Sequence, residues 1–248
     1  MDSLFFVFVL IGFFAQLVDG ALGMAYGVTS TTALVAVGLP PAVASANVHL
    51  AEIFTTAASG TSHAIARNID WRLFRRLAFF GALGGAIGAW GISTVDLHLA
   101  RPAIAAYLFV MGLVVLRKAI LPPAPPAQIN KVGLLGLVGG FCDATGGGGW
   151  GPIVTTNLIA RGGAPAKMIG TVNLAEFVVT VTTSGAFFLA LGANFGVAAA
   201  GLLVGGLVAA PLAAFLARKA PRRGMMAGVG ILICLVSAYT IWTFFQSL

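Results

Sequence analysis

Long apolar segments with very few charged residues constrain this chain more than any other feature. Only 8% of its 248 residues are Asp, Glu, Lys or Arg, and 59% are hydrophobic. A soluble domain carries about 25% charged residues and could not cover so much apolar surface. In a bilayer such segments form helices, because a helix satisfies its own backbone hydrogen bonds. The sequence therefore predicts an all-α polytopic membrane protein.

The basic residues lie in short loops between the apolar segments. The net charge of +7 would otherwise suggest nucleic-acid binding. Lys and Arg in such loops set the orientation of membrane helices, so we do not expect nucleic acid as a partner. Cys142 and Cys234 lie inside apolar segments without CxxC spacing. This pattern does not support a disulfide framework or a zinc site, and we expect no metal and no cofactor.

The chain repeats itself at a shift of 124 residues, which is half its length. Between Asp19 and Thr56 this shift aligns 15 identical residues in 38 positions, including Asp19 with Asp143 and Glu52 with Glu176. Shared composition does not explain matched acids, a matched proline and matched threonines. We predict one transmembrane domain, 1–248, made of repeat 1 (1–124) and repeat 2 (125–248), with the Pro-rich stretch 121–129 as the linker.

Each repeat is predicted to contain about five helical segments. They lie at 3–18, 27–38, 42–66, 74–95 and 100–119, and at 131–143, 151–160, 165–190, 196–217 and 224–245. The first two segments of each repeat are shorter than a span of about 20 residues. A glycine-rich tip joins them, 19–27 in repeat 1 and 143–151 in repeat 2. We predict a re-entrant or broken hairpin in each repeat, and two short full spans are the alternative.

The loop charges predict that the two repeats are inverted relative to each other. In repeat 1 the arginines from Arg67 to Arg76 follow the third segment, whereas in repeat 2 the basic cluster from Arg218 to Arg223 follows the fourth. Basic loops face the cytoplasm, so equivalent segments would cross the membrane in opposite directions. Inverted repeats are a recurring plan of secondary transporters.

The glycine-rich tips are candidate binding elements. Non-helical backbone at membrane depth occurs where protein buries it or where it lines a cavity. Each tip leads into a helix N-terminus, whose free N–H groups and dipole favour an anion. Close helix packing is the alternative role for the glycines, and binding of backbone N–H groups is the alternative for the aspartates. The candidate substrate-binding residues are Asp19, Gly23, Gly27, Thr31, Asp143, Gly147, Gly148, Gly149, Gly151 and Thr155.

A polar stripe follows one face of the third segment in each repeat. In repeat 1 it contains Ser45, His49, Glu52, Thr56, Ser59 and His63, and in repeat 2 it contains Asn173, Glu176, Thr180 and Thr183. Such a stripe faces the interior of a helix bundle, where Ser and Thr can also simply join helices. Carboxylates there are expensive and usually functional. The candidate proton-coupling residues are His49, Glu52, Asn173 and Glu176.

The two tips and the segments after them resemble the sulfite exporter TauE/SafE family. Each tip is followed by a short hydrophobic segment and a G-x-x-P-A turn, at 38–42 and 162–166. The tip at 146–149 is the most specific element, and the tip at 20–27 departs from the glycine-rich pattern, as in a divergent member. The resemblance implies a multi-pass permease of a prokaryotic inner membrane for sulfite, organosulfonates or related small anions.

Several functions are compatible with these residues. A small-anion transporter agrees with the tips, and a cation or cation-coupled transporter agrees with four intramembrane carboxylates. A membrane-embedded hydrolase would use His49 and Glu52, but a second histidine or a convincing nucleophile is missing. A membrane scaffold would not need acids at matched depths. We expect a small anion and the lipid bilayer as partners, no enzymatic activity, and leave a homo-oligomer open.

Overall fold

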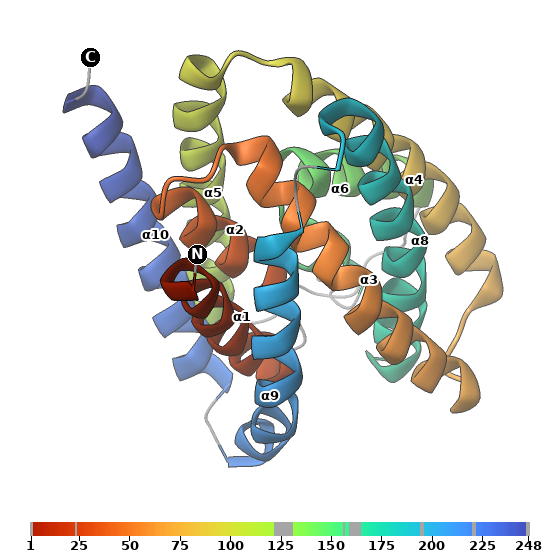
Figure 1. Cartoon of the computed structure of the whole chain (residues 1–248). Coiled ribbons are helices and arrows are strands. Elements are labelled where there is room, and N and C mark those ends of the chain that lie inside the picture. The colour runs from red at the N-terminus through yellow and green to blue at the C-terminus, as the bar shows by residue number, and fades with distance from the viewer. Residues whose placement is uncertain are drawn as a thin grey trace.

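Helices form the framework of the chain (Figure 1). The computed structural model describes residues 2–22, 24–121, 131–155, 157–158, 165–193, 196–219 and 222–246, and among these no strand occurs. The elements are α1 (Asp2–Leu22), α2 (Tyr26–Ala36), α3 (Pro41–Ile65), α4 (Trp71–Thr94), α5 (Leu97–Ile120), α6 (Val132–Gly146), the π-helical η1 (Trp150–Thr155), α8 (Pro165–Leu191), α9 (Val197–Lys219) and α10 (Arg222–Gln246).

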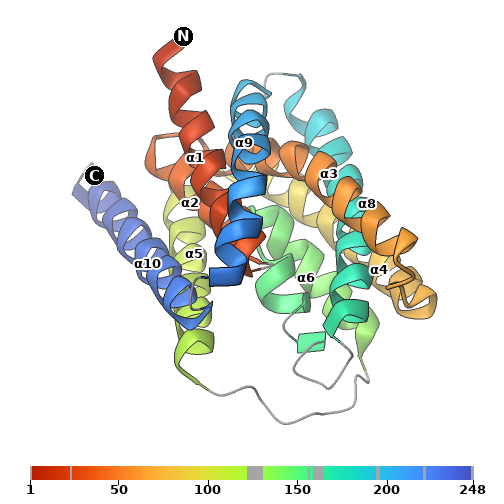
Figure 2. The same cartoon turned by 90° about the horizontal axis from the view of Figure 1, so that it is seen from below.

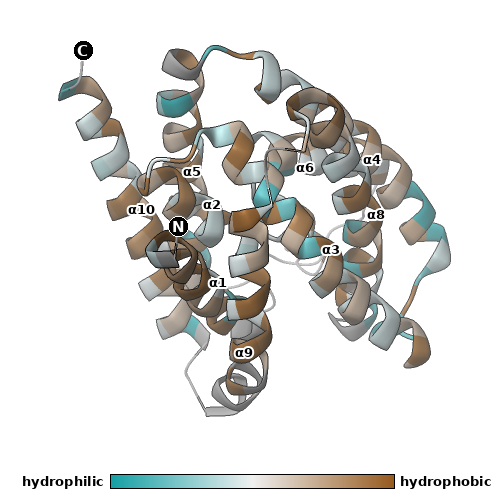
Figure 3. Cartoon of the chain, in the orientation of Figure 1, coloured by the Kyte–Doolittle hydropathy of each residue, from teal (hydrophilic) through white to brown (hydrophobic). Residues whose placement is uncertain are grey.

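The prediction of an all-α polytopic membrane protein is confirmed. In the described part of the chain four helices are long and apolar enough to cross a membrane: α4, α8, and the stretches 99–120 of α5 and 223–246 of α10. Large apolar side chains such as Phe6 and Leu189 are exposed on the outside. Polar side chains such as His49 and Glu52 are buried, and Figure 3 shows hydrophilic positions on α3 within the bundle. This arrangement suits lipid outside and polar groups inside.

The first two segments of repeat 1 form a hairpin with unequal arms. The α1 helix has 21 residues, and α2 has only 11. A helix of 11 residues is about 16 Å long, which is half of a hydrocarbon core of about 30 Å. The α2 segment therefore cannot be a full span, and the broken-hairpin interpretation holds for repeat 1. The prediction ended the first helix too early at residue 18, because the helix continues past Asp19 to the tip.

The equivalent hairpin of repeat 2 consists of α6 and η1. Helix α6 ends at Gly146 and is capped by Gly147, whose φ of 63° is left-handed and suits glycine. The second arm begins with η1, and Pro152 within it lacks a backbone N–H. Part of the predicted segment 151–160 lies outside the described residues.

The two repeats pack by exchanging equivalent helices. Helix α1 of repeat 1 packs along α9 of repeat 2, and α6 of repeat 2 packs along α4 of repeat 1. The third segments, α3 and α8, contact each other, and so do the fifth, α5 and α10; these pairs lie side by side in Figures 1 and 2. The shift of 124 residues converts the α1–α9 pair into the α6–α4 pair, so the sequence repeat is also a repeat of packing partners.

Small residues allow the exchanged helices to approach closely. A Cβ atom on Gly205 of α9 would overlap the carbonyl oxygen of Val9 in α1, and one on Gly84 of α4 would overlap that of Leu137 in α6. Glycine at such contacts lets two membrane helices meet at backbone distance. For these glycines, helix packing is a sufficient role.

Candidate functional site

The glycine-rich tips of the two repeats lie directly against each other. A Cβ atom on Gly27 would stand 2.6 Å from the carbonyl oxygen of Gly147, and one on Gly148 would stand 2.7 Å from the Cα of Val28. The hydroxyl of Thr31 donates a hydrogen bond of 2.7 Å to the same Gly147 oxygen. Tips from sequence positions more than 100 residues apart thus form one element.

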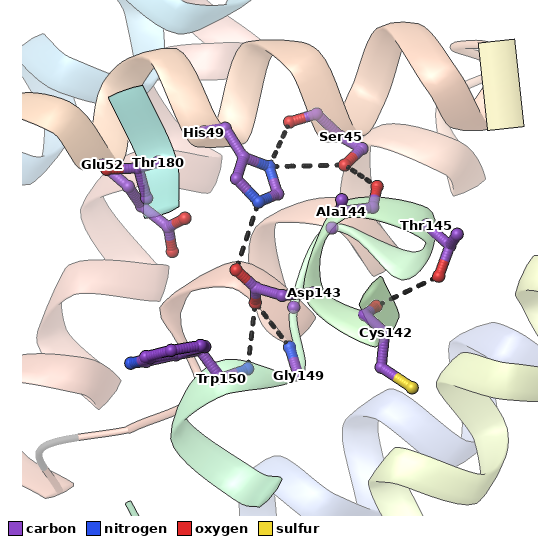
Figure 4. A network of polar contacts seen from close by, with 12 residues as sticks. Ser45, His49, Glu52, Cys142, Asp143, Ala144, Thr145, Gly149, Trp150 and Thr180 are labelled. Carbon is purple, nitrogen blue, oxygen red and sulfur yellow. Dashed lines mark hydrogen bonds and ion pairs between the residues drawn. The ribbon is translucent and has the colours of Figure 1, made fainter. Parts of the chain in front are cut away.

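Each matched aspartate binds the backbone at the start of the helix that follows its tip. Asp143 Oδ1 accepts hydrogen bonds from the N–H groups of Gly149 at 2.7 Å and Trp150 at 2.9 Å (Figure 4). Asp19 Oδ1 accepts one from the N–H of Tyr26 at 3.3 Å. Tyr26 and Trp150 are equivalent positions in the repeat. The aspartates therefore hold the tips in place, which was the simpler of the two predicted roles.

Buried aromatic side chains fix the tips from behind. The indole N–H of Trp150 donates to the carbonyl of Val172 at 3.3 Å, and the Tyr26 hydroxyl donates to that of Leu202 at 3.5 Å. The Tyr107 hydroxyl donates to the carbonyl of Gly148 at 2.8 Å. Tyr107 was not among the predicted site residues, because the repeat aligns it with an isoleucine and its neighbours in the chain are apolar.

A cavity of about 320 Å³ lies between the tips and the third helices of the two repeats. Ten of the predicted site residues line it, and they come from both repeats. These residues are Asp19, Gly27, Glu52, Asp143, Gly148, Gly149, Gly151, Thr155, Asn173 and Glu176. Thr31, Gly147 and His49 are not part of the lining and stand behind it. Gly23 lies outside the described residues.

The cavity follows the polar stripe of α3 in one direction. From Glu52 it runs past Thr56 and Ser59 to His63, near the end of the helix. Helix α8 contributes Asn173, whose amide donates a hydrogen bond of 2.7 Å to the Ser59 hydroxyl. The stripe therefore lines a path from the tips toward the basic loop that begins at Arg67.

Toward its N-terminus, α3 packs against the tip of repeat 2, and this contact closes the cavity on that side. His49 Nε2 lies 3.2 Å from Asp143 Oδ2, and the Ser45 hydroxyl donates 2.6 Å to the carbonyl of Ala144 (Figure 4). The ring of Phe187 packs 6.0 Å from that of His49. Glu52 lies beside the pair, within 4.8 Å of both, but because Nε2 and Oδ2 already bind each other we do not identify these side chains as metal ligands.

A lysine also reaches the cavity wall. Lys118 Nζ donates a hydrogen bond of 2.5 Å to the carbonyl oxygen of Pro152, which lines the cavity. Lys118 lies at the end of the predicted segment 100–119, next to Arg117 and close to the linker. Its side chain is long enough to run back from the end of α5 to the tip, as lysines near helix ends commonly do.

Comparisons with known proteins show the family of the chain. The family model described as "Sulfite exporter TauE/SafE" matches residues 8–240. "Probable membrane transporter protein YtnM" of Bacillus subtilis (strain 168) is 43% identical over 246 residues, which cover 95% of this chain and 82% of that protein. No solved structure gives a significant match. The chain therefore belongs to the sulfite exporter TauE/SafE family and is a membrane transporter.

Proposed function

We propose that this protein is a secondary transporter of a small anion, most directly sulfite or an organosulfonate, and that the anion binds in the cavity between the two repeats. The observation that carries this proposal is the joint contribution of both tips to one cavity. Gly27 at the start of α2, and Gly148 and Gly151 beside the start of η1, all line it. The aspartates bind the N–H groups of Tyr26, Gly149 and Trp150, but a helix start also has a positive dipole end, and this favours an anion.

Side-chain donors complete the proposed anion site. Thr155 lines the cavity, where its hydroxyl would donate to the anion, and Lys118 places its positive charge beside Pro152, at the end of the same tip. No positive charge has to be buried in the cavity itself. A weakly held anion can leave again, as transport requires.

The carboxylates in the cavity would couple anion binding to proton uptake. Asp19, Asp143, Glu52 and Glu176 line the space that would receive the anion, and like charges repel strongly where the dielectric constant is low. Proton uptake relieves this repulsion. Binding of anion and proton would then strengthen each other by the same factor. Glu52 and Glu176 are the proposed carriers, because the aspartates already bind backbone N–H groups.

Access to the site supports an alternating mechanism. The cavity extends toward His63 and the basic loop after α3, which by its charge faces the cytoplasm. The exchanged packing of equivalent helices agrees with an inverted repeat, in which each side of the site opens in turn. The proposed location is the inner membrane of a prokaryote, and the proposed partners are the small anion and the bilayer.

A cation or cation-coupled transporter is the second candidate. It is favoured by the number of carboxylates in the lining, since Asp19, Glu52 and Glu176 could ligate a cation together. A hard cation such as Na⁺ or Mg²⁺ prefers such oxygen ligands. The two candidates differ in what saturates the site.

A binding screen on purified protein tests the proposal. Sulfite, sulfate, thiosulfate, taurine and sulfoacetate are titrated separately, against Na⁺ and Mg²⁺ as chlorides. We expect one of the anions to saturate a single site, and Thr155→Val to weaken its binding about tenfold, the effect of one hydrogen bond to a charged group. Thr182→Val is the control, because Thr182 bonds only within α8 and does not line the cavity. Saturation by a cation alone would overturn the proposal.

A further inference from the structure

The contacts beyond Asp143 close one side of the cavity. We call Ser45, His49, Asp143, Ala144 and Phe187 the closing layer. His49 and Ser45 bind the tip of repeat 2, Phe187 of α8 covers the His49 ring, and His49 is fully buried. None of these residues except Asp143 lines the cavity.

The hydrogen bonds around His49 determine where its protons are. Nδ1 lies 2.8 Å from the carbonyl oxygen of Ser45, which can only accept a hydrogen bond. The Ser45 hydroxyl gives its single hydrogen to Ala144, so toward Nδ1 it can also only accept. Nδ1 therefore carries a hydrogen.

The other ring nitrogen then needs a second proton. In a neutral imidazole with hydrogen on Nδ1, Nε2 has a lone pair, and Asp143 Oδ2 at 3.2 Å has lone pairs as well. Only a proton between them makes this contact a hydrogen bond. Asp143 Oδ1 accepts from two N–H groups, which an oxygen of a carboxylate and the carbonyl oxygen of a neutral carboxyl can both do. Because an imidazole is a stronger base than a carboxylate, we place the proton on Nε2.

On the open side of the cavity, the residues equivalent to the closing layer do not close the cavity. The shift of 124 residues converts Ser45, His49 and Asp143 into Ile169, Asn173 and Asp19, and converts Phe187 back into His63. These four equivalents all line the cavity. The closing layer is thus packed shut on one side of the site, and its equivalent residues on the other side face the cavity. Only the closed side has a histidine beside the aspartate, since Asn173 cannot carry a proton.

A buried hydroxyl lies on α8, one turn before Phe187 of the closing layer. Thr183 of α8 is fully buried and its Oγ1 has no hydrogen-bond partner within the described structure. Its equivalent in repeat 1 is Ser59, which lines the open part of the cavity. Opening of the layer would give Thr183 the exposure that Ser59 has here.

We infer that His49 is a protonated latch: its imidazolium binds Asp143 and holds this side closed, and loss of the proton allows the side of Thr183 to open. The inference deepens the proposed transport function and rests on it. The titratable groups around the pair are Glu52 of α3, Glu176 of α8, Asp19 of α1, Cys142 of α6 and Tyr107 of α5. All five are acids, so a positive imidazolium among them reduces the net negative charge of the buried cluster.

Cysteine accessibility tests the latch. Thr183→Cys and Ser59→Cys are made separately in a background without Cys142 and Cys234, and labelled with a small soluble thiol reagent from about pH 5.5 to 8.5. The ratio of the two rates cancels the titration of the thiol. We expect the Thr183/Ser59 ratio to rise with pH, by at most about tenfold per pH unit, because one proton separates the two states. A ratio independent of pH overturns the latch.

Histidine variants show whether His49 causes the pH dependence of the Thr183/Ser59 ratio. His49→Asn copies the residue that repeat 2 has at this place and should abolish the pH dependence of the ratio. His63→Asn, on the open side, should leave it intact. Persistence of the pH dependence in His49→Asn contradicts the inference.

A spectroscopic measurement avoids the risk that His49→Asn does not fold. The chain has three histidines, so His63→Asn with His98→Asn leaves His49 alone for ¹⁵N NMR. Both ring nitrogens should be protonated at the low end of the pH range, and an unprotonated Nε2 throughout would overturn the latch. Neither readout uses anion transport. A failure of the proposed function and a failure of the latch are therefore separate outcomes.

Discussion

Substitution of Gly148 by alanine tests whether direct contact between the two tips holds the site together. The new Cβ atom would overlap the backbone N of Val28 and stand 2.7 Å from its Cα, so backbone atoms rather than a flexible side chain would have to move. Overpacking of this kind costs about 1–3 kcal/mol. For a chain of this length that corresponds to a decrease in Tm of roughly 2–12 °C.

Gly185→Ala is a matched control for this substitution. Gly185 lies in α8, and a Cβ atom there would have no atom within 4 Å. Alanine in a helix is more stable than glycine by about 1 kcal/mol, so this variant should be unchanged or slightly stabilised.

The assay compares thermal unfolding and anion binding of both variants in the same detergent. Gly148→Ala should unfold at a lower temperature and lose anion binding, because the tips must separate to make room. If Gly148→Ala binds the anion and unfolds like Gly185→Ala, the contact between the tips is not what builds the site.

Three further predictions follow from the same geometry. Single cysteines at Arg72 and Ala193, in a background without Cys142 and Cys234, should label from opposite sides of the membrane if the repeats are inverted, and same-side labelling would exclude inversion. Lys118→Met should weaken anion binding about tenfold, as expected for loss of a nearby charge, while Arg117→Met, exposed on the same turn, should not. Anion affinity should fall as pH rises because binding takes up a proton, and Glu52→Gln or Glu176→Gln should flatten this dependence without abolishing binding, after correction for protonation of the anion itself.

Much of the fold could be predicted because its signals are local. The apolar length of a segment fixes a membrane helix, and the glycines and aspartate at each tip mark the place where a helix must break. The 124-residue shift then indicated that Asp19 and Asp143 have equivalent roles, and both do bind the N–H groups at the start of the next helix.

The contacts between elements could not be predicted in the same way. His49 was selected as part of a stripe on α3, but its partner Asp143 lies 94 positions away on a tip, and only the packing of the two repeats brings them together. The contact of Tyr107 with Gly148 also joins two repeats. The contact of Lys118 with Pro152 was not predicted either, because sequence does not show the direction of a long side chain.

Which side of the site is open also depends on more than the repeat. A sequence repeat treats Ser59 and Thr183 as equivalent, although one lines the cavity and the other is fully buried. A transporter with two equivalent arrangements occupies one of them at a time, and the sequence is compatible with both.

If a small anion crosses the membrane through the cavity between the tips, proteoliposomes with the purified protein should take up radiolabelled sulfite. We expect saturable uptake that unlabelled sulfite or an organosulfonate inhibits and that an inward proton gradient accelerates. Gly148→Ala should abolish this uptake, and Gly185→Ala should retain it. Uptake no faster than in protein-free liposomes for every anion tested, together with saturable flux of a cation, would contradict anion transport through the cavity.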